Sequence, residues 1–156
     1  MKRLLAAIVI LLVLGFAGEV LATGACVHTS TETVNVLGER QRKIITFTCT
    51  SDGSGIATYS FSPATFGVRG WYLYNVTTDP SGVSAPTDSY DVTYVVGGED
   101  IAGGLLANRS STLTQTVAIA PTTLGYYMGD GAIVMTFANI TSNPGIFVMK
   151  MYWTTN

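Results

Sequence analysis

Short segments in which apolar and polar residues alternate recur along the sequence, and they constrain the fold more than any other feature. In Lys43–Thr50, for example, Ile45, Phe47 and Cys49 fall on one face and threonines fall on the other. This period of two is typical of a strand with one buried face. The pattern predicts about eight strands: Val34–Leu37, Lys43–Thr50, Ile56–Phe61, Gly70–Thr77, Tyr90–Val96, Leu113–Ala120, Ala132–Ala138 and Gly145–Trp153.

Turn-forming sequences such as Asp52-Gly53 and Gly97-Gly98 separate these segments. Connections of this length suit antiparallel neighbours, whereas parallel strands need crossover helices. We therefore predict an all-β fold, an antiparallel β-sandwich of jelly-roll or immunoglobulin-like type. The chain has 156 residues, of which 47% are hydrophobic and 12% charged, and neither a repeat nor a low-complexity linker divides it. One β-sandwich domain over residues 25–156 is expected.

Two segments are rich in large side chains on both faces, namely Trp71–Tyr74 and Met149–Trp153. This pattern favours central strands covered by two layers, because aromatic residues and methionine commonly fill cores. The alternative is an interface with another molecule.

An apolar segment with the layout of a secretory signal peptide precedes the β domain. Lys2 and Arg3 come before the uninterrupted apolar run Leu4–Ala17, and small residues follow it. The run has 14 residues, fewer than the roughly 20 that a helix needs to cross a bilayer. We predict a signal peptide over residues 1–24 and export to the periplasm, the exterior or the cell surface. A membrane contact is expected only through this leader, if it is retained.

Cys26 and Cys49 both lie in the part predicted to be exported, where an oxidising compartment allows pairing. A hairpin of residues 29–37 and 43–50 turning near Gly38 brings the two cysteines close together. The sequence therefore predicts a disulfide. Two free buried thiols, or a lipid on Cys26, are the alternatives.

The charge pattern gives no indication of a nucleic-acid partner. Removal of the leader leaves six of the eight basic and nine of the ten acidic residues, a formal charge of −3. The basic cluster formed by Arg40, Arg42 and Lys43 lies beside a predicted turn, where a solvated hairpin end explains it.

Catalytic motifs are missing from the sequence. It has one histidine, His28, and no nucleophile elbow, phosphate-binding glycine loop or zinc-ligand spacing. We predict a protein that is not an enzyme and needs neither a cofactor nor a metal. Two loop carboxylates could serve a glycosidase or hold calcium, but the turn contexts favour structural roles for these acids: Asp88, Asp91, Glu99, Asp100 and Asp130.

One block, Ala85–Arg109, has a more specific pattern. It contains Pro86-Thr87-Asp88-Ser89-Tyr90-Asp91, an acidic glycine turn, Gly103-Gly104 and Asn108-Arg109. This resembles small phage and prophage structural proteins, in which a Pro-Thr-Asp-x-Tyr-Asp strand start leads to a Gly-Gly segment and an Asn-Arg pair. The resemblance implies a virion-associated building or decoration role.

The block also has a structural interpretation without any family. Its residues are turn formers, glycines and one arginine, so we expect them to support the fold: Pro86, Asp88, Tyr90, Asp91, Gly103, Gly104, Asn108 and Arg109. Arg109 is predicted to pair with Asp88 or Asp91.

The function expected from these observations is a non-enzymatic structural or assembly protein, virion-associated or exposed on a surface. Its partner would be another copy of itself or a larger protein assembly. The alternative is a secreted bacterial binding module, for example for glycans, which would carry an exposed aromatic platform.

Overall fold

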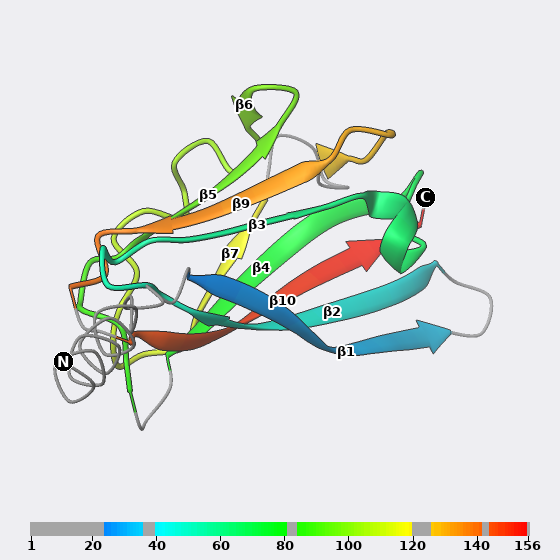
Figure 1. The fold of residues 1–156 in the computed structure, drawn as a ribbon. Helices are drawn as coiled ribbons and strands as arrows, with labels where there is room; N and C mark the ends of the chain where they lie inside the picture. The colour runs from blue at the N-terminus through cyan, green and yellow to red at the C-terminus, as the bar shows by residue number, and fades with distance from the viewer. Residues whose placement is uncertain (1–23, 36–39, 81–83, 120–125, 142–143, 156) are drawn as a thin grey trace, which may run out of the picture.

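The computed structural model describes residues 24–35, 40–80, 84–119, 126–141 and 144–155. They form two antiparallel sheets packed face to face (Figure 1). Sheet A has the order β1 (Ala25–Asn35), β2 (Gln41–Thr50), β10 (Ile146–Thr154), β4 (Tyr72–Pro80) and β7 (Gln115–Ala118), and β8 (Tyr126–Tyr127) also pairs with β4. Sheet B has the order β3 (Ala57–Phe61), β9 (Ile133–Ala138), β5 (Asp91–Val96) and β6 (Glu99–Asp100). The predicted all-β sandwich is confirmed.

The strand order distinguishes between the two predicted sandwich types. Strands β2 and β10 are neighbours in sheet A, as are β4 and β7, while β3 pairs with β9 and β5 with β6 in sheet B. In the series from β2 to β10, the first strand thus pairs with the last, the second with the next to last, and the remaining strands pair inward in the same way. This nested pairing, with the chain passing between the sheets, is the jelly-roll arrangement. Strand β1 is added at the edge of sheet A, outside the nested pairs.

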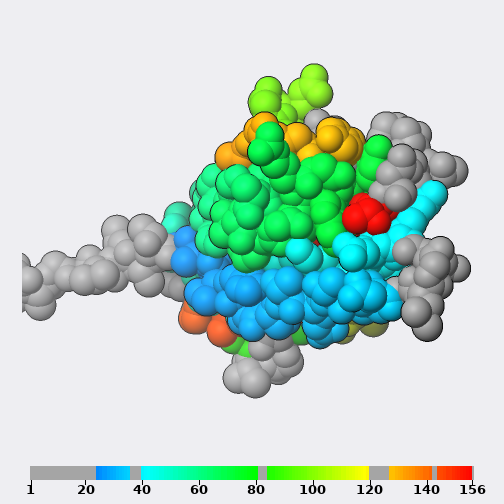
Figure 2. Space-filling model, turned by 90° about the vertical axis from the view of Figure 1, so that its right-hand side faces the viewer, coloured from blue at the N-terminus to red at the C-terminus, as the bar shows by residue number. Residues whose placement is uncertain are grey.

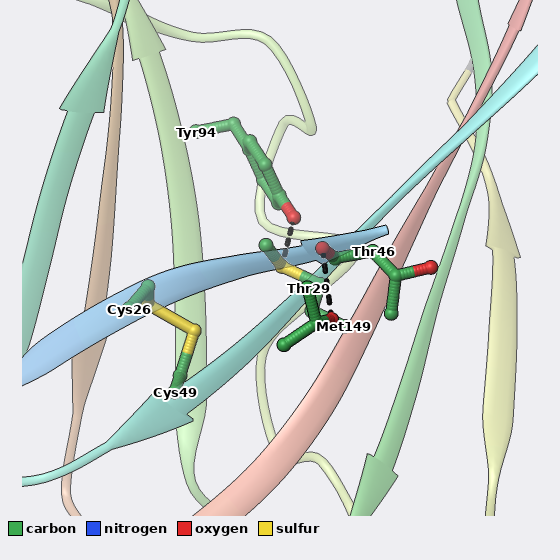
Figure 3. Close-up of a disulfide and its surroundings, with 6 residues drawn as sticks. All are labelled: Cys26, Thr29, Thr46, Cys49, Tyr94 and Met149. Atoms are coloured by element: carbon green, nitrogen blue, oxygen red, sulfur yellow. Dashed lines mark hydrogen bonds between the residues drawn. A yellow bond between two sulfur atoms is a disulfide. The ribbon is translucent and has the colours of Figure 1, made fainter. Parts of the chain in front are cut away.

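The core lies between the sheets and is built from the inward side of each alternating strand. Ile45, Phe47 and Cys49 are fully buried on β2, as the pattern of this segment predicts. On sheet B, Tyr94 is also fully buried, and its hydroxyl donates to Sδ of Met149 on β10 (Figure 3). The alternation therefore indicates correctly which face of these strands is buried.

The strand boundaries differ from the predicted ones mainly at the N-terminal edge. Strand β1 begins at Ala25 rather than Val34, because a polar Ser/Thr stretch without clear alternation still pairs with β2. Strands β6 and β8 have two residues each and carry too little pattern to be recognised. Residues 1–23 of the predicted signal peptide and the turn at Gly38 lie outside the described residues. Within the described ranges, no helix has the length and apolar character required to span a bilayer.

A disulfide joins Cys26 to Cys49 across the β1–β2 pair (Figure 3). The two cysteines are directly opposite each other in the register, with a Cα–Cα distance of 4.0 Å, and both are buried. Three residues further along, Thr29 forms a bulge in β1, and its hydroxyl donates to the carbonyl of Thr46 at 3.2 Å. The disulfide therefore fixes the start of the edge strand. A small disulfide-bonded β domain is typical of proteins outside the reducing cytoplasm.

Candidate binding surfaces

The predicted structural block links the two sheets at one end of the sandwich. An isolated bridge pairs Tyr90 with Arg109: the Arg109 N–H donates to the Tyr90 carbonyl at 2.7 Å, and the Ser89 N–H donates to the Arg109 carbonyl at 3.0 Å. Gly103 and Gly104 form the return between these residues with φ of 56° and 77°, a left-handed conformation that glycine adopts without strain. Pro86, near the start of the block, is buried.

The predicted ion pair between Arg109 and Asp88 or Asp91 is wrong. Arg109 is 4% exposed, and its guanidinium points into the protein. Its Nε donates to Oγ1 of Thr78 on β4 at 2.9 Å, and its Nη2 donates to the carbonyl of Gln115 on β7 at 2.7 Å. Burial lowers the pKa of Arg109, because it disfavours the charged form. Arg109 thus connects the segment between β6 and β7 to two strands of sheet A.

The two aspartates of the block hold backbone amides instead. Asp91 accepts the Asn108 N–H at 2.8 Å on one oxygen and the side-chain amide of Asn139 at 2.5 Å on the other. Asp88 accepts the Ser111 N–H at 3.0 Å. Asn108 has φ of 53°, and the Asp91 carboxylate fixes it in that conformation. These contacts explain why short acidic and amide side chains occur at these positions.

The other candidate carboxylates also stabilise local structure. Asp100 accepts backbone N–H groups of Tyr94, Ala102 and Gly104, and Asp130 pairs with Arg69 at 2.5 Å. Glu99 is exposed on β6. Among the described residues, no three His, Cys, Asp or Glu side chains are grouped so that they could hold a metal ion.

His28 lies on β1 at the surface. Its ring centroid is 4.9 Å from that of Phe66 and 5.9 Å from that of Phe47, and its Nε2 lies 2.8 Å from Oγ1 of Thr31. These contacts anchor the imidazole against the aromatic end of the core.

A shallow groove of about 480 Å³ opens between the turn after β2 and the turn after β9. It is lined by Gly53, Ser54, Ile56 and residues 138–141. None of these residues is charged, and the Asn139 amide already donates to Asp91. The groove therefore has no charged group and a largely apolar lining that includes Ile56 and Ile140.

Strand β1 is the longest free edge among the described residues. It has 11 residues, whereas the other terminal strands, β3, β6 and β7, have five, two and four. Figure 2 shows β1, in blue, running along the side of the molecule that faces the viewer. Val27 and Val34 are 63% and 45% exposed on it. Apart from its bulge and one charged residue, Glu32, β1 has little of the usual edge protection, since it contains no proline and no lysine.

The register identifies which backbone groups of β1 point outward. A Cα–Cα distance of 4.0 Å at Cys26–Cys49 fits a non-hydrogen-bonded pair, so the N–H groups of both cysteines point away from each other. The backbone N–H and C=O groups of odd-numbered residues in β2 therefore point toward β10. Consistent with this, the Ser51 N–H donates to the Gly145 carbonyl and the Thr155 N–H donates to the Gln41 carbonyl. Because Thr33 is opposite the odd-numbered Lys43, its N–H and C=O point to the open edge.

Four tyrosines form a second surface, which we call the tyrosine face: Tyr72, Tyr74, Tyr127 and Tyr152. They occupy the outer side of sheet A, opposite the core, because their neighbours Leu73, Met128, Met151 and Trp153 are buried. The ring centroids of Tyr72 and Tyr127 are 5.3 Å apart, and those of Tyr74 and Tyr152 are 6.2 Å apart. Tyr127 is 56% exposed and the other three are half-buried.

The tyrosine face corrects the expectation that these strands are covered by two layers. One side of β4 and β10 is core, but no described element packs on the other side. The outer side of sheet B differs, since its described strands present small side chains such as Thr58, Thr93 and Thr136 and no aromatic ring. Aromatic residues outside the core are thus concentrated on one of the two sheets.

No family model matches the chain, and no curated protein or solved structure is significantly similar to it. The geometry of these surfaces is therefore the basis for assigning a function.

Proposed function

We propose that the protein is a non-enzymatic structural component that assembles by pairing β1 with β1 of a second copy. The observation that carries this proposal is the 11-residue free edge, held in an extended conformation by β2 and by the disulfide. An edge of this kind offers a row of unpaired N–H and C=O groups to another strand.

The regular part of the edge is Ser30–Asn35, after the bulge at Thr29. Antiparallel pairing of this segment with the same segment of a second copy makes a two-fold, self-complementary contact. It joins two copies of sheet A into one continuous sheet. Because β1 is already ordered, pairing costs less conformational entropy than the folding of a loose segment would.

The setting we propose is a virion or a cell surface, where the exported protein would build or decorate a larger assembly. The resemblance of Ala85–Arg109 to phage structural proteins supports this setting, and jelly rolls are common in viral capsids. They also occur in lectins, so a secreted binding module is the second candidate. The tyrosine face favours that alternative.

The assembly proposal is tested with Thr33→Pro. Proline removes an N–H that points to the open edge, so the β1–β2 ladder stays intact while pairing with a second copy is blocked. Thr33→Ala is the matched control. We expect native mass spectrometry and light scattering to find a dimer or larger assembly for the wild-type protein and for Thr33→Ala, and a folded monomer for Thr33→Pro.

A wild-type protein that stays monomeric at about 100 μM, a concentration that detects even weak contacts, would overturn the proposal. So would a Thr33→Pro variant with an unchanged assembly state. The circular dichroism spectrum of Thr33→Pro should match that of the wild type, which separates loss of pairing from loss of folding.

A further inference from the structure

We propose that the tyrosine face is a binding site for an acidic polysaccharide. This site lies on the outer side of sheet A and is distinct from the β1 edge.

The first argument is the arrangement of the rings. Tyr152 on β10 is directly opposite Asn75 on β4, and Tyr72 is opposite Thr154, two residues further along β10 and three along β4, where the register shifts. The four tyrosines therefore belong to adjoining positions of one sheet surface. Folding does not require them there, because they lie outside the core. Aromatic faces carry partial negative charge and attract the polarised C–H groups of a sugar ring.

The second argument is the charge beside the rings. Lys150 lies two residues from Tyr152 on the same side of β10, and Arg42 of β2 is opposite Thr154. Neither cation makes an ion pair with any residue in the described part of the chain. Two carboxylates also lie on this side of sheet A: Asp79, which is opposite Val148 and accepts the Thr114 hydroxyl, and Glu32, which is two strands away from Tyr152. Lys150 shares a strand with Tyr152, so its cation complements a ligand that carries negative charge next to the ring.

The third argument is the polar surround. Thr46 is opposite Lys150 on β2, and Thr116 of β7 is opposite the buried Thr77, whose hydroxyl it contacts at 2.7 Å. Two apolar residues, Ile44 and Val148, lie on the same side of the sheet. Threonine is under-represented at the energetic centres of protein–protein interfaces, whereas hydroxyl groups match those of a polysaccharide. Half-buried rings, hydroxyls and cations together fit an acidic glycan. Because tyrosine and arginine are also common at the centres of protein interfaces, poly-glutamate is included in the test as the acidic polypeptide.

The binding test uses the Thr33→Pro variant, so that edge pairing does not contribute through avidity. Polygalacturonate, alginate and hyaluronate serve as probes in affinity electrophoresis, and dextran is the neutral counterpart. We expect retardation by at least one acidic probe, less by dextran, and weakening with added salt. If Thr33→Pro aggregates, wild-type protein at nanomolar concentration is used in the electrophoresis instead.

Variants distinguish the contribution of rings and charge. Tyr152→Ala should weaken binding about tenfold, and Lys150→Gln about three- to fivefold. Lys150→Arg and, on the outer side of sheet B, Thr136→Ala should bind as well as their parent. No retardation by any acidic probe would overturn the proposal. Binding that Tyr152→Ala leaves unchanged, or equal binding to poly-glutamate, would also overturn it, because charge alone would then explain the contact.

Discussion

Replacement of Arg109 by alanine tests whether the buried guanidinium fastens the two sheets together. The side chain is 4% exposed, and it donates at 2.9 Å to Thr78 and at 2.7 Å to the carbonyl of Gln115. Hydrogen bonds from a charged donor contribute about 1.5–3 kcal/mol each. Part of this gain is offset by the desolvation of the cation, whose burial also lowers the pKa of Arg109.

We expect Arg109→Ala to lower the free energy of unfolding by about 3 kcal/mol, which combines the lost hydrogen bonds with the cavity left behind. For a domain of this size that corresponds to a fall in Tm of about 10 °C. Arg109→Met fills most of the space but donates no hydrogen bond, so it should recover only the part of the loss that is due to the cavity. Thermal melts at neutral pH, with the disulfide intact, measure both.

The control is a second arginine, Arg69. It pairs with Asp130, but the two side chains are 65% and 71% exposed, so Arg69→Ala should cost at most about 0.5 kcal/mol. If Arg109→Ala melts within about 2 °C of the wild type, well below the shift expected from these bonds, the role given to the guanidinium is wrong. The same conclusion follows if Arg69→Ala is the more destabilising of the two.

Three further predictions concern the disulfide and the titrating groups. Loss of the Cys26–Cys49 bond in a double alanine variant should cost about 3 kcal/mol in denaturant unfolding, and hydrogen exchange should rise first in β1; uniform exchange across sheet A would contradict this. The hydrogen bond from the backbone N–H of Ile56 lowers the pKa of Asp52, and the hydrogen bond from the Ser54 side chain has the next largest effect. These bonds therefore stabilise the folded state above the unfolded pKa of 3.8, and this stabilisation is lost as the pH falls through the folded pKa. The Tm of Asp52→Asn should therefore depend less on pH below 4 than that of the wild type. Burial raises the pKa of Tyr94 well above 10.0, so stability falls as pH rises beyond 10.0, and Tyr94→Phe should unfold at higher pH than wild type in an alkaline titration.

The sequence predicts the sandwich well because its central strands alternate regularly. In β2, the buried residues Ile45, Phe47 and Cys49 are the ones that the period of two assigns to the core. The same pattern cannot choose between a jelly roll and an immunoglobulin-like sandwich. That choice depends on which strands pair, and the nested order β2–β10 and β3–β9 is a long-range property that local alternation does not encode.

The candidate surfaces are harder to predict, because both are defined by what lies next to a strand. The residues of β1 form a polar Ser/Thr segment whose status as a free edge appears only once β2 has paired with β10 on its other side. Tyr72, Tyr74 and Tyr152 belong to strands rich in large side chains, a pattern that suits a buried strand as well as an exposed aromatic surface. The sequence predicts that Arg109 pairs with an acidic neighbour, but its buried guanidinium bonds to Thr78 and Gln115 across the sandwich.

Both candidate surfaces belong to sheet A, and this gives the two sheets different tasks. Sheet B presents small side chains such as Thr93, Val134 and Thr136 to the outside, and aspartates in or beside its strands hold turns in place. Sheet A carries the long edge, the disulfide that fixes it and the exposed tyrosines. If β1 strands of two copies pair, the continuous sheet that results also brings their two tyrosine faces onto one surface, since β1 and β4 are strands of the same sheet. A polysaccharide long enough to reach both faces would then bind with higher effective affinity than either face alone provides. Assembly through the edge would therefore strengthen binding through the face, although the two contacts share no residue.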